Sequence, residues 1–281
     1  MTDKGQDETK HRVILAVAPN GSRRGKDNHP TIPLSKEDLL REAPEWRDAG
    51  VSVLHLHIRD RDGGHSLDAE TYKDVLTALR GVVGRDMVLQ MTTEAGGVFG
   101  RDVQMACVRA VRPEAVSLAL REIAPKDDQK TEFAEFIGWM HKEGIAPQVI
   151  LYDRDDLNRL TAWIREGVID GSETSVLYVL GRYTADQKSN PVDLLGFLGI
   201  EALPVRDWMV CAFGPNESRC AALAALLCGH IRVGFENNFH LPDGRIAGSN
   251  AELVAATASL LSALHVPLAT AADARALWRI G

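Results

Sequence analysis

The stretch Val53-Leu54-His55-Leu56-His57-Ile58-Arg59-Asp60 places two histidines in an apolar run that ends abruptly in charge. A near-continuous apolar run is typical of a β-strand covered on both faces. Because side chains alternate along a strand, His55 and His57 point to the same side. Two neutral imidazoles that converge on one point suit a metal ion. The alternative is a pair of core histidines with hydrogen-bond partners, and at this spacing we favour the metal.

On both sides of this stretch, short β-branched runs alternate with longer amphipathic ones, which is typical of parallel βα units. Eight strands are expected, the fourth with the weakest pattern: Val13–Ala18, Ser52–His57, Met87–Thr92, Ala115–Leu118, Gln148–Leu151, Ser175–Leu180, Trp208–Ala212 and Ile231–Phe235. Ser35, Asn216 and Ser249 are expected to cap helices. No G-x-G-x-x-G follows the first strand, which disfavours an open dinucleotide-binding sheet. The sequence predicts an α/β fold, a (β/α)8 TIM barrel, as a single domain over residues 1–281 with a polar extension at residues 1–11.

Composition excludes several classes of partner. The 32 basic and 39 acidic residues give a net charge of −7, which argues against a nucleic-acid or anionic-membrane partner. The N-terminus is polar and acidic, and no apolar run approaches the length that spans a membrane. We therefore expect a cytoplasmic protein. Its four cysteines form no paired motif and are expected to be reduced and buried: Cys107, Cys211, Cys220 and Cys228.

In a barrel of this kind, functional groups gather at the C-terminal ends of the strands. The loop after the first strand carries Asn20 and Arg23 and is basic, so it can hold an anionic substrate or the phosphates of a cofactor. A solvated basic loop is the alternative. Thr92, Thr93 and Glu94 follow the third strand. We take Asn20, Arg23 and the two threonines as candidate substrate-binding residues.

The second and eighth strands both flank the first strand, so Glu236 is expected to join His55 and His57 on one metal ion. Two histidines and one carboxylate leave an open coordination position, for which Zn²⁺ is the natural ion. Non-haem iron uses the same residue types and stays an alternative. Arg232 lies four residues before Glu236 and faces the same side if the strand is regular. Its guanidinium suits a substrate carboxylate or an enolate, and the alternative is a structural ion pair.

Three motifs carry a resemblance to a known family: His55-Leu56-His57-Ile58-Arg59, Gly229-His230-Ile231-Arg232-Val233-Gly234-Phe235-Glu236 and Ser249-Asn250-Ala251. From about Val13 to the C-terminus the chain resembles the β-keto acid cleavage enzymes, the family that includes 3-keto-5-aminohexanoate cleavage enzyme. The resemblance implies a (β/α)8 barrel, usually a homotetramer, with one zinc ion on the two histidines and Glu236. It also implies an acyltransferase whose partners are small molecules. A β-keto acid and acetyl-CoA, the cosubstrate, give acetoacetate and a new CoA thioester, with Arg232 assisting enolate formation and Thr92 binding the carboxylate.

Three residues depart from the family pattern. Asn237 stands where the family commonly has Asp, and an amide can orient Arg232 by hydrogen bonding but cannot act as a base. Arg23 replaces an acidic residue, so a keto acid with a neutral or anionic distal end is expected. Glu122, after the fourth strand, is then the candidate for a relocated catalytic acid or base.

Two other functions stay open on the sequence alone. One is a CoA-independent, zinc-dependent retro-aldol lyase or hydrolase, which the amide at position 237 leaves possible. The other is a non-catalytic metabolite-binding barrel with a structural zinc ion, against which the open coordination position speaks.

Overall fold

A closed barrel of parallel strands forms the centre of the computed structural model, which describes residues 11–199 and 203–280. In the described part of the chain the eight barrel strands are β1 (Leu15–Val17), β2 (Val53–Leu56), β5 (Val88–Thr92), β6 (Ala115–Ala119), β7 (Ala146–Leu151), β8 (Ser175–Leu180), β9 (Asp207–Ala212) and β10 (His230–Val233). They follow one another around the barrel in chain order, and β1 pairs with both β10 and β2. The predicted TIM barrel and each of its eight strands are confirmed, although β1, β2 and β10 end earlier than expected.

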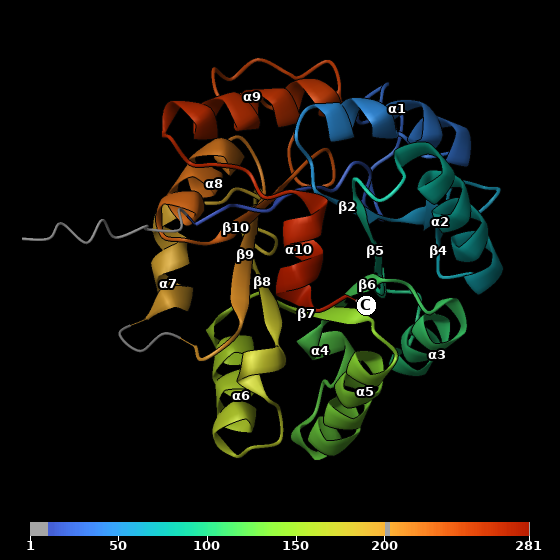
Figure 1. The fold of residues 1–281 in the computed structure, drawn as a ribbon, viewed down its shortest axis with the longest axis vertical. Helices are drawn as coiled ribbons and strands as arrows, with labels where there is room; N and C mark the ends of the chain where they lie inside the picture. Colours follow the sequence, from blue (N-terminus) through green and yellow to red (C-terminus); the bar gives the residue numbers. More distant parts are fainter. Residues whose placement is uncertain (1–10, 200–202, 281) are drawn as a thin grey trace, which may run out of the picture.

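Helices surround the barrel on the outside (Figure 1). They are α1 (Lys36–Asp48), α2 (Ala69–Val83), α3 (Arg101–Val111), α4 (Leu120–Ile123), α5 (Lys130–Lys142), α6 (Arg154–Arg165), α7 (Leu195–Leu198), α8 (Glu217–Leu226), α9 (Asn250–Ala263) and α10 (Ala271–Trp278). Short 3-10 turns lie at Asp127–Gln129, Gly171–Glu173 and Pro191–Leu194, and a hairpin of β3 (Ile58–Arg59) and β4 (His65–Ser66) follows β2.

Two of the three predicted helix caps are confirmed. The side chains of Ser35 and Ser249 accept hydrogen bonds from the third residue of their helices. Asn216 occupies the cap position of α8, but its side chain makes no cap bond and instead donates to the carbonyl oxygen of Ser189 at 2.9 Å. The prediction of a side-chain cap at Asn216 is therefore wrong, because a neighbouring loop binds this amide.

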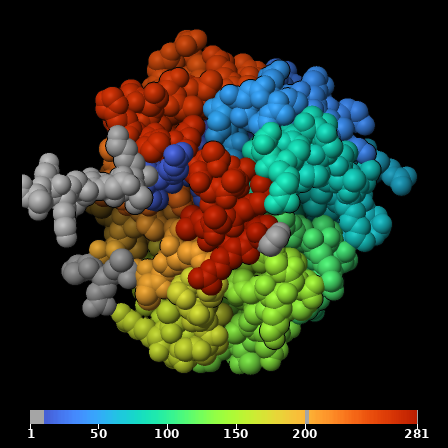
Figure 2. Space-filling view, viewed as in Figure 1, coloured from blue at the N-terminus to red at the C-terminus, as the bar shows by residue number. Residues whose placement is uncertain are grey.

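Helix α10 covers the end of the barrel at which the strands begin. Ala269, just before it, donates its backbone N–H to the carbonyl oxygen of Val13 at 2.8 Å. Arg275 in α10 donates to the carbonyl oxygen of Met87 at 2.8 Å, next to the start of β5. Figure 2 shows α10, in red, at the centre of this face with the outer helices around it. A site of the TIM-barrel type is therefore expected at the opposite end, where the strands finish.

Apolar side chains fill two layers, one between the strands and the helices and one inside the barrel. Inside, residues such as Val53 and Val88 share the lumen with the buried polar side chains of His55, Gln90 and Gln148. Burying polar groups costs free energy of desolvation unless they are hydrogen-bonded, so these side chains are expected to have hydrogen-bond partners.

The four cysteines are free. Cys107, Cys211 and Cys220 are buried as predicted, whereas Cys228 is exposed. The prediction is wrong for Cys228 because α8 ends at Leu226, before this residue. Cys228 lies in the turn that follows, with a left-handed φ of 63°. Among the described residues, no helix combines the length and the apolar character needed to cross a membrane.

Candidate functional site

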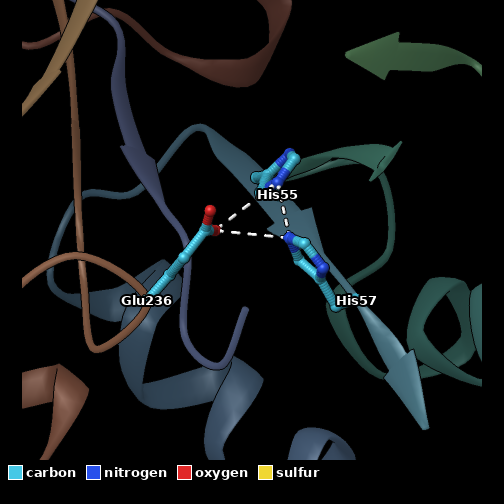
Figure 3. Close-up of side chains that lie close together, drawn as sticks. All are labelled: His55, His57 and Glu236. Atoms are coloured by element: carbon cyan, nitrogen blue, oxygen red, sulfur yellow. Dashed lines mark hydrogen bonds and ion pairs between the residues drawn. The ribbon is translucent and has the colours of Figure 1, made fainter. Parts of the chain in front are cut away.

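Three side chains converge at the end of the barrel where the strands finish: His55, His57 and Glu236 (Figure 3). The Nε2 atoms of the two imidazoles lie 3.2 Å apart. Oε2 of Glu236 lies 3.6 Å from Nε2 of His55 and 3.4 Å from Nε2 of His57. Both imidazoles are buried, and the Glu236 side chain is 14% exposed. We call these three residues the trio.

The barrel and a glycine turn bring the trio together. His55 lies in β2 and His57 directly follows it, while β1 separates β2 from β10. Strand β10 ends at Val233, and Gly234 has a φ of 139° that side chains rarely allow. A Cβ atom at Gly234 would lie 2.3 Å from the carbonyl oxygen of Ala18. The proximity of Glu236 to Arg232 therefore comes from this turn, and the expected reason, a regular strand through Phe235, is wrong.

The charges of the trio match those of a metal-binding site. Burial, and then the charge of Arg232, hold the pKa of His55 well below its ordinary value, so its imidazole is neutral. Burial opposes the charge on Glu236, but Arg232 and the two imidazoles outweigh it and hold the pKa of Glu236 well below its ordinary value. Neutral imidazole and ionised carboxylate are the forms that bind metal.

An unpaired oxygen tests whether a metal ion fits this site. Oε2 of Glu236 is buried and has no hydrogen-bond partner among the described residues, although it faces both imidazoles. The two Nε2 atoms, 3.2 Å apart, and that oxygen all lie within 4.8 Å of one another. One nitrogen from each histidine and one carboxylate oxygen fit a divalent cation with a further coordination position free for a small molecule.

A line of hydrogen bonds across the barrel interior orients His55. Oε1 of Gln90 lies 2.9 Å from Nδ1 of His55. Nε2 of Gln90 donates to Oε1 of Gln148 at 3.2 Å, and Nε2 of Gln148 lies 3.7 Å from Sδ of Met209. Because Gln148 binds the NH₂ group of Gln90, the carbonyl of Gln90 faces His55 and accepts the Nδ1 proton. Nε2 of His55 is then left free as a ligand, the usual arrangement behind a metal-bound histidine.

Arg232 is buried beside the trio. Its Nη2 lies 3.2 Å from Oε1 of Glu236 and 3.3 Å from Sγ of Cys211. Its Nε and Nη1 have no hydrogen-bond partner among the described residues, and neither do the two polar side-chain atoms of Asn237. The structure therefore lacks the hydrogen bond that the sequence predicts between Asn237 and Arg232, because the guanidinium turns to Glu236 and Cys211. The Asn237 carbonyl oxygen accepts from Arg24 at 3.4 Å.

Three of the four candidate substrate-binding residues use their polar atoms within the protein. The Thr92 hydroxyl accepts from the backbone N–H of Glu94 at 3.0 Å, and the Thr93 hydroxyl donates to the carbonyl oxygen of Ser117 at 3.1 Å. The Asn20 amide donates to the carbonyl oxygen of His57 at 2.9 Å and so fixes the backbone of a trio residue. The fourth, Arg23, is exposed at the mouth of the site.

A cavity of about 70 Å³ opens beside the trio. Its lining contains Asn20, Gly21, Ser22, Arg23, Arg24, Glu94, Arg182, Gln187, Phe213 and Glu236. This volume is far below the ~300–1,000 Å³ of sites for drug-sized ligands, so it suits a small molecule. Oε2 of Glu94 lies 3.7 Å from Nδ1 of His57, which places a second carboxylate behind that ligand.

Glu122 lies beside the cavity but is absent from the described residues that line it. Its Oε2 accepts the backbone N–H of Ala95 at 2.9 Å. Burial, and also the nearby charge of Glu94, raise the pKa of Glu122. A buried carboxyl with a raised pKa matches a catalytic acid or base, but it is Glu94 that lines the cavity and lies 3.7 Å from His57.

Four of the residues at the site are not predicted as site residues from the sequence, although each has a sequence feature that could identify it. Glu94 and Arg182 both lie two residues past a barrel strand, at the end where functional groups gather. Gln90 and Gln148 are polar residues within apolar strands, at inward positions of the two-residue repeat. The polar side chain in a buried strand is the signal that identifies them.

Comparisons with known proteins agree with this geometry. A family model described as beta-keto acid cleavage enzyme matches residues 12–280. The chain is 30% identical over 271 residues to 3-keto-5-aminohexanoate cleavage enzyme of Acetoanaerobium sticklandii, covering 94% of this chain and 97% of that protein. It is 28% identical over 274 residues to 3-oxoadipate:acetyl-CoA acetyltransferase of Cupriavidus necator, covering 94% of this chain and 93% of that protein.

Among solved structures, the apo structure of ObcA matches with a TM-score of 0.70 at 17% identity. The match covers 90% of this chain and 66% of that chain. At this identity the likeness shows the fold alone.

Proposed function

This chain belongs to the beta-keto acid cleavage enzyme family, and on that premise we propose that it is a zinc-dependent acyltransferase. Its substrates are a β-keto acid and acetyl-CoA, and its products are acetoacetate and a new CoA thioester. The observation that carries the proposal is the trio, with its unpaired carboxylate oxygen, beside a small cavity lined by a further carboxylate and by arginines. Two relatives in the family are named as enzymes that use acetyl-CoA on oxo acids.

The reaction balances without an oxidant or reductant. The carbon between the keto group and the carboxylate loses a proton and forms a bond to the acetyl carbonyl carbon, which releases the CoA thiol. The thiol then attacks the original keto carbon, whose bond to that same central carbon breaks, and a proton returns to the product. When bound, a divalent ion on the trio supplies Lewis-acid polarisation of a keto oxygen.

The chain supplies the remaining requirements through fixed charges. Arg232 presents two unpaired, buried donors next to the trio, where negative charge develops as the enolate forms. Glu94 lines the cavity, whereas Glu122 is absent from its described lining residues, so we assign the proton transfer first to Glu94. Glu122 keeps the role of a nearby acid that shares the proton. Asn237 takes part in the site through its backbone carbonyl oxygen, which accepts a hydrogen bond from Arg24.

The main rival uses the same trio without CoA, as a retro-aldol lyase or a hydrolase. Asn237 favours it, because the amide removes the carboxylate that the family pairs with the arginine. The two are separated by measuring keto acid consumption by the pure protein with and without acetyl-CoA. Our proposal predicts consumption only with acetyl-CoA, together with acetoacetate. Consumption at the same rate without any CoA ester would favour the rival. A structural zinc ion is disfavoured, because the trio supplies three ligand residues where a structural site usually has four, and Glu236 lines the cavity.

A further inference from the structure

Arg182 is a half-buried cation that lines the cavity and donates no hydrogen bond to the described residues. It lies two residues after β8, and its side chain is 11% exposed. Among the described residues its guanidinium makes no hydrogen bond, and its ion pair is a long one, 3.9 Å from Nη2 to Oε1 of Glu94. A guanidinium has five donors in a planar fork. None of the Arg182 nitrogens is among the fully buried, unpartnered atoms of the described residues, so water reaches the fork, and the acceptor oxygens of a ligand can replace that water.

The other buried or half-buried arginines around the trio each donate at least one hydrogen bond within the protein. Arg24 donates to the carbonyl oxygen of Phe235 at 2.9 Å and stacks on Phe239. Arg59 donates to the carbonyl oxygen of Arg24 at 2.9 Å. Arg232 donates from Nη2 to Glu236, although its Nε and Nη1 are unpaired. Arg182 differs from these three because its guanidinium packs on an aromatic ring and donates no hydrogen bond to the described residues.

The loop that carries Arg182 is fixed in place before any ligand arrives. Gly181 turns with a φ of 79°, and a Cβ atom there would lie 2.5 Å from the backbone nitrogen of Ser189. That nitrogen donates to the carbonyl oxygen of Phe213 at 2.8 Å, so the loop is bound to the end of β9. The carbon at the centre of the Arg182 guanidinium lies 5.4 Å from the centroid of the Phe213 ring. A prepositioned fork loses little entropy when it binds a planar anion.

We propose that Arg182 binds a carboxylate of the keto acid, an inference that rests on the proposed function. The cavity of about 70 Å³ holds Arg182 and Glu236 in one lining, so a small acid that reaches the trio also reaches the guanidinium. The Thr93 hydroxyl donates to the carbonyl oxygen of Ser117, and Thr92 is buried and absent from the described residues that line the cavity, so Arg182 is the better placed group for the carboxylate. The carboxylate is either the one beside the keto group or a second one at the distal end of the substrate.

The test compares the protein with Arg182→Gln on two acids of equal length, 3-oxohexanoate and 3-oxoadipate, with acetyl-CoA. We expect kcat/KM for the affected acid to fall roughly 10- to 150-fold, as for loss of hydrogen bonds to a charged group, while KM for acetyl-CoA stays unchanged. Equal losses on both acids identify the carboxylate beside the keto group, and a loss on the diacid alone identifies the distal one. Arg61→Gln, an exposed arginine on a nearby loop, is the matched control and should leave both acids unaffected.

Calorimetric binding of each acid to the metal-loaded protein, without acetyl-CoA, separates this inference from the proposed function. If the acid binds more weakly to Arg182→Gln, the inference is supported even when no acetoacetate forms. The absence of acetoacetate would then contradict only the proposed function. Unchanged affinity and KM for both acids in a folded Arg182→Gln protein would overturn the inference. A defect that falls on KM for acetyl-CoA instead of the acid, or no binding of either acid to the unaltered protein, would overturn it as well.

Discussion

Replacing Gln90 with Leu should weaken metal binding without removing a metal ligand. In the structure the Gln90 carbonyl, 2.9 Å from Nδ1 of His55, fixes the imidazole with Nε2 turned toward Glu236. Leu preserves the bulk at this buried position but accepts no hydrogen bond. Loss of such a partner behind a metal ligand costs about 10- to 100-fold in affinity, or about 1.4–2.7 kcal/mol. Gln148→Leu should have a smaller effect, because it only frees the Gln90 amide to turn.

The assay is a competition titration of the apo protein against a chromogenic zinc chelator. Gln104→Leu is the matched control, since Gln104 is also buried but lies in α3 and donates to the carbonyl oxygen of Phe99 at 3.4 Å. Both variants are first checked for an unchanged circular dichroism spectrum. If Gln90→Leu bound zinc within about threefold of the unaltered protein, far less than the expected loss, the orienting role of Gln90 would be refuted.

Three further predictions concern proton transfer, the turn and a buried acid. Glu94→Gln should lower kcat by about 10²- to 10⁴-fold and Glu122→Gln by less than tenfold in steady-state assays, because Glu94 lines the cavity; the reverse order would return the role to Glu122. Gly234→Ala should reduce both zinc affinity and the free energy of unfolding, the latter by about 1–3 kcal/mol, because its Cβ would lie 2.3 Å from a backbone oxygen. Gly244→Ala, at a φ of 89° with open space around it, is the control for backbone strain alone, and an equal effect there would exclude the clash. Burial raises the pKa of Asp207 from its ordinary 3.8 to about 6, so its protonated form stabilises the fold below pH 3.8 and this stabilisation is lost as the pH rises through 6. Urea denaturation measures the free energy of unfolding from pH 4 to 7. Over this range it should fall by up to about 3 kcal/mol more in the unaltered protein than in Asp207→Asn, and parallel pH profiles would contradict this.

The sequence was enough for the barrel because its strands are buried on both faces and therefore appear as apolar, β-branched runs. Closure of the barrel puts β1 between β2 and β10, and this neighbourhood predicts that Glu236 meets the two histidines. Period-two alternation correctly predicts that His55 and His57 face one point, even though β2 ends one residue before His57.

The sequence was not enough for contacts that depend on how loops meet. Asn20 lines the cavity, and its role in substrate binding stays a prediction, but the sequence does not show that its amide also binds the backbone of His57, 37 residues away. The Thr93 hydroxyl is taken by the carbonyl oxygen of Ser117 on the neighbouring strand. Whether a hydroxyl or amide is free for a ligand depends on such partners, which residue type and spacing do not specify. The same limit hid Arg182, whose free donors are visible only once its neighbours are placed.

The most direct test of the proposed reaction follows a carbon label from acetyl-CoA. The metal-loaded protein is incubated with a β-keto acid and acetyl-CoA labelled with ¹³C at the acetyl carbonyl carbon, and the products are read by NMR. We expect the label at the keto carbon of acetoacetate, because the new carbon–carbon bond forms there, and none from the His57→Ala protein. Label recovered only in acetate or in unreacted acetyl-CoA, while the keto acid is consumed, would contradict it.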